Sequence, residues 1–102
     1  MKLGEQICIF IENSEFFKRF CLQSGWMSGS QTYVYPISDW VSDRQIDIQI
    51  NSLVSHNGMT NSFKKLIKDI NKEFGADTIL NWWYKKNDGS CPQEYTLYYK
   101  EV

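Results

Sequence analysis

The chain has 102 residues, a net charge of −1 and an aromatic content of 16%. This length predicts one domain spanning 1–102 that can bury a core of its own. The slightly acidic balance disfavours a nucleic-acid-binding domain, because such domains are usually basic. The first residues lack the pattern of a secretory signal, and no apolar run is long enough to span a bilayer. We therefore expect a cytoplasmic protein that contacts no membrane.

The first half of the chain predicts a strand, a helix and two further strands. The continuous apolar run over 7–11 is typical of a central strand covered on both faces. A helix is expected near 14–24, with Asn13 or Ser14 as its N-cap. The segment 32–35 favours a short strand that ends at Pro36. Over 46–50, apolar and polar residues alternate, which predicts a strand with one buried and one wet face.

The second half predicts a helix followed by a β-hairpin. Apolar residues at helical spacing over 61–74 form one stripe, and Gly75 is placed to end that helix. The segments 78–84 and 94–100 favour two strands joined by a turn at Asp88-Gly89. A two-residue turn there would set Trp82 opposite Tyr95 and Leu80 opposite Leu97.

These elements follow the order β-α-β-β-α-β-β. They predict an α+β fold, a two-layer sandwich in which two helices cover one face of a mostly antiparallel five-stranded sheet.

The aromatic residues of the hairpin are the most informative feature for function. Consecutive strand residues point to opposite faces, so Trp82 and Trp83 are expected on different sides of the sheet. We expect Trp82 in the core with Leu80. Two helices can hardly cover both faces, so the second face is a candidate binding surface with an aromatic centre and a polar rim. Its expected residues are Trp83, Tyr98, Ile79, Asn81, Glu94 and Thr96.

An enzyme or ligand-binding domain is the first alternative. Cys91 follows a turn and His56 lies in a polar loop, so the two side chains are candidates for a thiol and its base. No nucleophile signature surrounds Cys91, and an incidental thiol is favoured. Cys8 and Cys21 are interpreted as small buried hydrophobes. We therefore name no catalytic residue, and an enzyme is the less favoured class.

Charged rows and metal-ligand patterns add little. Lys64, Lys68 and Lys72 form an i, i+4 row that is typical of the wet face of a helix. Together with Trp83 and Tyr98, such lysines would also suit a single-stranded nucleic acid, which is the second alternative. Asp39, Asp43 and Asp47 recur every four residues but favour caps and a solvated strand edge. No spacing indicates a metal site or a cofactor.

The sequence favours a small non-catalytic module that binds another protein or a second copy of itself, as an inhibitor, immunity protein or adaptor would. It names no partner.

Overall fold

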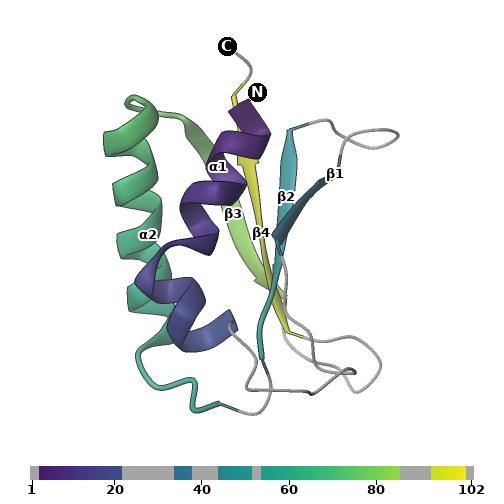
Figure 1. Ribbon diagram of the computed structural model, residues 1–102, viewed down its shortest axis with the longest axis vertical. Coiled ribbons are helices and arrows are strands. Elements are labelled where there is room, and N and C mark those ends of the chain that lie inside the picture. The colour runs from purple at the N-terminus through teal and green to yellow at the C-terminus, as the bar shows by residue number, and fades with distance from the viewer. Residues whose placement is uncertain (1–2, 22–33, 38–43, 52–53, 86–92, 101–102) are drawn as a thin grey trace.

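The structure is a computed structural model that describes residues 3–21, 34–37, 44–51, 54–85 and 93–100. The fold is α+β and places its helices beside an antiparallel sheet (Figure 1). In chain order its elements are α1 (Leu3–Glu12), the π-helical turn η1 (Phe17–Cys21), β1 (Val34–Ile37), β2 (Gln45–Gln49), α2 (Met59–Phe74), β3 (Ile79–Lys85) and β4 (Glu94–Tyr99).

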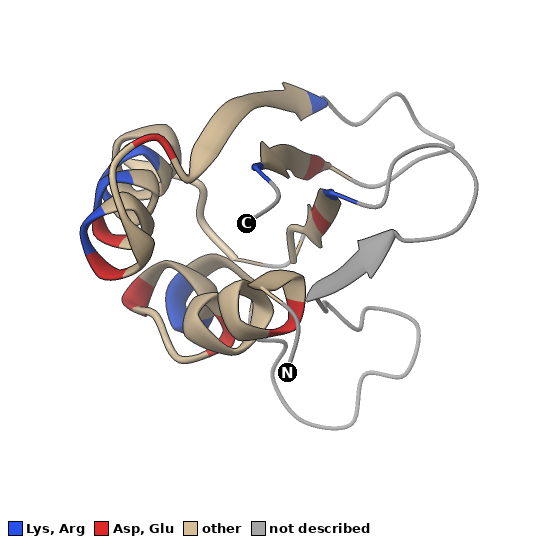
Figure 2. Ribbon diagram, turned by 90° about the horizontal axis from the view of Figure 1, so that it is seen from above, with Lys and Arg blue, Asp and Glu red and all other residues tan. Residues whose placement is uncertain are grey.

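The sheet has the strand order β1-β2-β4-β3, and every neighbouring pair is antiparallel. Seen from above, α1 and α2 lie on the same side of the sheet (Figure 2). The predicted α+β class and the antiparallel sheet are therefore confirmed. The predicted five strands are wrong for the described residues, which form four. The predicted hairpin turn at Asp88-Gly89 lies outside the described residues.

The missing strand is the predicted central one, because the apolar run over 7–11 belongs to α1. Gly4, Ile7, Cys8 and Ile11 are the buried residues of this helix, at the spacing of one helical face. Ile9, in the middle of the run, is 46% exposed. One face of α1 packs on the sheet, and the apolar residues on its other faces are not covered by a second layer of secondary structure among the described residues.

The helix expected near 14–24 is confirmed over its described part, which is helical from Glu15 to Cys21, and 22–24 lie outside the described residues. Ser14 ends α1 and begins the next turn, since its Oγ accepts the Phe17 backbone N–H at 3.2 Å and donates to the Ile11 carbonyl at 2.6 Å. The chain then widens into the π-helical turn η1, which buries Phe17, Phe20 and Cys21. The predicted cap at Ser14 is correct.

Helix α2 confirms the prediction over 61–74 and begins two residues earlier, at Met59. Phe63, Leu66 and Ile70 are buried, and the Gly75 N–H closes the last turn on the Asn71 carbonyl at 3.0 Å. Within the described ranges, neither α2 nor any other helix is long and apolar enough to cross a membrane.

The core lies between the helices and the inner face of the sheet, by which we mean the face that the helices cover. Ile46 and Ile48 of β2 and Tyr95 and Leu97 of β4 are fully buried there. Phe63 of α2 stacks on Tyr95, with ring centroids 4.0 Å apart and an interplanar angle of 16°. The predicted burial of the β2 isoleucines is confirmed.

A close approach of α1 to β4 gives the first testable consequence. A Cβ on Gly4 would collide with the Tyr99 hydroxyl oxygen and lie 2.9 Å from its Cζ, and Tyr99 is 6% exposed. We expect Gly4→Ala to lower the free energy of unfolding by about 1–3 kcal/mol, although alanine favours helix. Urea denaturation measures this change. The loss should shrink in a Tyr99→Phe background, and a stabilising Gly4→Ala would contradict the packing.

Candidate functional site

The β3–β4 hairpin keeps the predicted division of faces with a different register. Trp82 lies opposite Leu97, and Tyr84 lies opposite Tyr95. The predicted pairing of Trp82 with Tyr95 is therefore wrong by two residues. Side chains alternate with period two, so a shift of two leaves the residues from Asn81 to Lys85 on their predicted faces. Trp82 is half-buried against the core, and Trp83 is on the other side.

A β-bulge at the start of β3 reverses two of the predicted positions. The register shifts between Ile79 and Asn81, which leaves Leu80 as the extra residue. Ile79 is 8% exposed and belongs to the core, whereas Leu80 is 61% exposed. The Ile79 N–H donates to the Asn71 Oδ1 of α2 at 2.9 Å. Ile79, a predicted binding residue, is thus a core residue, and Leu80 is not.

The outer face of the sheet, opposite the helices, brings the other predicted residues together. Trp83 and Asn81 of β3 pair with Thr96 and Tyr98 of β4, and Glu94 lies opposite Lys85. The Trp83 and Tyr98 rings are in contact, with centroids 5.0 Å apart and planes at 46°. Trp83 is 48% exposed, Asn81 is exposed, and Tyr98 and Glu94 are half-buried. This outer face is the candidate binding surface.

Side chains in the middle of the outer face are buried, whereas those along its β3 side are exposed. Thr96 is 5% exposed and Asp47 of β2 is 8% exposed. The Thr96 Oγ1 donates to the Asp47 Oδ1 at 2.9 Å, and the Gln45 Nε2 donates to the same oxygen at 3.2 Å. Asp47, predicted to lie on a wet face, is therefore buried, and its carboxylate accepts these two hydrogen bonds. Thr96 supports the surface from below, and Trp83 is its exposed centre.

Glu94 gives the outer face a pH dependence. Partial burial and the nearby Asp47 carboxylate raise the pKa of Glu94, and Lys85 opposes that shift. The folded state thus favours the protonated acid, and its stability falls as pH rises through the raised pKa. We expect Glu94→Gln to be more stable than the wild type at neutral pH. Urea denaturation from pH 4 to pH 7 should show that difference growing with pH, and a difference independent of pH would contradict it.

Two further exposed side chains of β3, Leu80 and Tyr84, were not expected from the sequence, and Tyr84 lies on the inner face in ring contact with Tyr95. Among the described residues, four large hydrophobic side chains are exposed, and Leu80, Trp83 and Tyr84 of these four lie on β3. The Tyr84 hydroxyl donates to the Gln93 Oε1 at 2.5 Å. Tyr84 reads as a core residue by alternation, and it is exposed because β3 is the last strand of the sheet.

Of the two residues of the alternative enzymatic site, the structure describes only His56. Cys91 lies outside the described residues, and the half-buried His56 ring contacts the Asn51 carbonyl through Nε2 at 3.0 Å. Burial raises the pKa of the Cys8 thiol to about 12, with smaller contributions from Glu12 and Glu5. Burial likewise raises the pKa of Cys21. Neither described thiol is poised to ionise at neutral pH.

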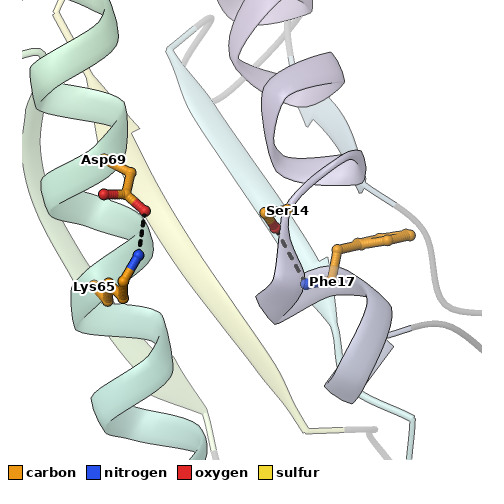
Figure 3. A network of polar contacts seen from close by, with 4 residues as sticks. All are labelled: Ser14, Phe17, Lys65 and Asp69. Carbon is orange, nitrogen blue, oxygen red and sulfur yellow. Dashed lines mark hydrogen bonds and ion pairs between the residues drawn. The ribbon is translucent and has the colours of Figure 1, made fainter.

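A groove lies between α1 and α2 in the described part of the chain. It holds about 530 Å³, and Ile9, Phe10, Phe16, Leu66 and Phe74 form its apolar part. Lys65 and Asp69 lie on its α2 side and form an ion pair of 3.1 Å (Figure 3). Ser14 lies on the α1 side, where it binds the Phe17 N–H in the same view.

The described residues gather no group of three His, Cys, Asp or Glu side chains that could hold a metal ion. The predicted lysine row is exposed along α2. Asp39 and Asp43 of the predicted carboxylate series lie outside the described residues. Comparison with protein-family models, with curated proteins and with solved structures finds no match to this chain.

Proposed function

We propose that this protein is a non-catalytic module that binds another protein through the outer face of its sheet, as a small inhibitor or adaptor does. The observation that carries the proposal is Trp83: a large aromatic side chain, 48% exposed, in contact with Tyr98 and bordered by Asn81 and Glu94. A tryptophan on a rigid strand with a polar rim is the composition of an interface hot spot.

The packing of the core supports this assignment of faces. Phe63, Tyr95 and Trp82 fill the space under the helices, with the Phe63 and Trp82 ring centroids 4.9 Å apart. Trp83 is not part of that cluster. An exposed tryptophan contributes less to folding than a buried one, so its place on the surface is explained better by binding than by stability.

Site-specific photo-crosslinking tests the proposal. Benzoylphenylalanine replaces Asn81 on the outer face in one variant and Ile9 on α1 in a matched control, because Ile9 is 46% exposed on the helical side of the molecule. We expect a cross-linked protein partner from cells that express the Asn81 variant. Equal cross-linking from both positions, or from Ile9 alone, would contradict a binding surface on the outer face.

The groove between α1 and α2 favours a second candidate function, the binding of a small apolar ligand. Its volume of about 530 Å³ lies within the range of small-molecule sites, and five aromatic or aliphatic side chains form its apolar part beside polar ones. Filling the groove with Ile9→Trp should abolish binding of an apolar fluorescent dye such as anilinonaphthalene sulfonate. Binding that survives Ile9→Trp but is lost in Trp83→Ala would place the dye on the outer face instead.

A further inference from the structure

The open side of β3 offers a backbone that another strand can pair with. β3 is the last strand in the order β1-β2-β4-β3, and no described strand lies beyond it. Seven residues long, it is longer than either strand of the β1–β2 pair at the other side of the sheet. Exposed strand edges carry unpaired backbone groups and are the usual sites at which an extended segment adds to a sheet.

The hydrogen bonds of β4 determine which β3 residues point their backbone N–H and C=O groups toward the open edge of the sheet. The Tyr99 N–H donates to the Arg44 carbonyl at 3.0 Å, and the Gln93 carbonyl accepts the Ile50 N–H at 2.9 Å. Odd-numbered residues at both ends of β4 therefore turn their backbone groups toward β2. In an antiparallel ladder these directions alternate, so the even-numbered residues of β4 turn theirs toward β3.

The partners of those even-numbered residues on β3 are Asn81, Trp83 and Lys85, which leaves Trp82 and Tyr84 with their backbone groups toward the open side. One contact agrees with this assignment: the Trp82 N–H does not reach β4 and donates to the Asn81 Oδ1 at 2.8 Å. The Asn81 amide thus occupies a donor that an added strand would use.

Side chains along this edge suit a partially apolar strand. Leu80 is 61%, Trp83 48% and Tyr84 38% exposed. The rings of Trp83 and Tyr84 lie on opposite faces of the sheet, in contact with Tyr98 and Tyr95 respectively. An added strand would find an aromatic neighbour on each face, and such cross-strand pairs stabilise a sheet.

The charged residues near the open edge of β3 indicate which charge an added partner strand should carry. Asn71 of α2 reaches β3 through its bond to the Ile79 N–H, and Lys64 and Lys68 lie on the same side of that helix at i−7 and i−3. Both lysines are exposed. Lys85 ends the strand and is its only charged residue. The charge on β3 itself is therefore positive, and the helix side that carries Asn71 adds the two lysines.

A second copy of this chain fits that charge poorly. Two β3 strands paired about a twofold axis perpendicular to the sheet would set their α2 helices side by side, with Lys64 and Lys68 of each facing the other. Like charges so placed repel, whereas glutamates or aspartates on a partner strand would attract the same lysines.

We propose that β3 takes up an extended acidic segment of a partner protein as an added strand, with the Trp82 and Tyr84 backbone as its ladder and Lys64 and Lys68 as its charge contacts. This inference rests on the proposed function and specifies the partner's binding segment. Asn81 acts as a competitor in the unbound protein, because its side chain must release the Trp82 N–H before the ladder forms.

The test uses the full chain and a fluorescein-labelled peptide of alternating valine and glutamate, followed by fluorescence anisotropy. Two further peptides are N-methylated on alternate amides, one on each set. We expect one methylated peptide to bind like the parent and the other to lose at least tenfold in affinity, because only one set of amides faces β3. Equal binding by both methylated peptides, or no saturable binding of the parent, would overturn strand addition.

Charge reversal gives a matched comparison. Lys64→Glu/Lys68→Glu and Lys18→Glu/Lys65→Glu change the net charge equally, and the second pair lies in η1 and on the groove side of α2. Only the first double variant should weaken the peptide, by tenfold or more at low salt. Equal weakening by both would show a nonspecific charge effect and overturn the assigned contacts.

Asn81→Thr frees the Trp82 N–H and should strengthen peptide binding about three- to tenfold. Weaker binding by this variant would contradict the competitor role of Asn81. A dimer in sedimentation equilibrium that excludes the peptide would assign the edge to a second copy. A partner that cross-links at position 81 while both methylated peptides bind equally would leave the proposed function standing and remove strand addition alone.

Discussion

Phe63→Ala is expected to lower the free energy of unfolding by about 3–5 kcal/mol, as truncation of a fully buried phenylalanine does. Phe63 has no exposed surface and lies at the centre of an aromatic cluster. Its ring is 4.0 Å from that of Tyr95, 5.2 Å from that of Phe16 and 4.9 Å from that of Trp82, measured between centroids. The truncation removes three ring contacts at once and leaves a cavity where α2 meets the sheet.

Urea denaturation followed by circular dichroism measures this loss. A chain of this size is typically stable by about 5–15 kcal/mol, so Phe63→Ala removes a large share of the total. Phe74→Ala is the matched control, because Phe74 is only half-buried at the end of α2 and makes its ring contact with Phe10 at 5.7 Å. A loss at Phe63 no larger than that at Phe74 would contradict the placement of the core.

Thr96→Val is expected to cost about 1.5–3 kcal/mol of unfolding free energy, because it removes a hydrogen bond to a buried charged group while keeping the side-chain shape. The Thr96 hydroxyl donates to Asp47 at 2.9 Å, and both side chains are less than a tenth exposed. The variant leaves Asp47 with the Gln45 amide at 3.2 Å as its remaining donor among the hydrogen bonds described above.

Thr96→Ser separates the hydroxyl from the methyl group. It keeps the donor to Asp47, so its loss should be smaller than that of Thr96→Val when both are measured by urea denaturation. A valine variant as stable as the wild type would show that the Asp47–Thr96 bond does not support the outer face. Asp47 and Thr96 thus stabilise the fold beneath the proposed surface, whereas Trp83 is the residue expected to contact the partner.

Elements with one strong period could be predicted from the sequence. The stripe through Phe63, Leu66 and Ile70 specified α2, and the alternation through Ile46 and Ile48 specified β2. Each pattern repeats often enough to distinguish the helical period of about 3.6 residues from the strand period of two. The faces on which Trp82 and Trp83 lie could also be predicted, since a register shift of two residues leaves both side chains on the same faces.

The apolar run over 7–11 was too short to distinguish a strand from a helix. Five consecutive apolar residues fit a buried strand and a helix equally, and the deciding feature is that Gly4, Ile7, Cys8 and Ile11 share one helical face. The sequence holds that spacing, but Gly4 reads as a breaker until its contact with Tyr99 is known.

The bulge at Leu80 depends on a tertiary contact that no local pattern shows. The Asn71 side-chain oxygen accepts a hydrogen bond from the Ile79 N–H, and the pairing of β3 with β4 shifts by one residue immediately after Ile79. That shift buries Ile79 and exposes Leu80. The exposure of Tyr84 was equally hidden, because it follows from the position of β3 at the end of the sheet. The candidate surface could be predicted in its centre and not in its margin.

The most direct test of the proposed surface is the affinity of Trp83→Ala for the partner that cross-links at position 81, measured by isothermal titration calorimetry with Ile9→Ala as the control of equal exposure. We expect Trp83→Ala to lose about 2 kcal/mol or more, roughly thirtyfold in affinity, while remaining folded by near-ultraviolet circular dichroism. Ile9→Ala should bind as the wild type does. Wild-type affinity in a folded Trp83→Ala protein would contradict the account, and so would a Trp83→Ala protein that fails to fold.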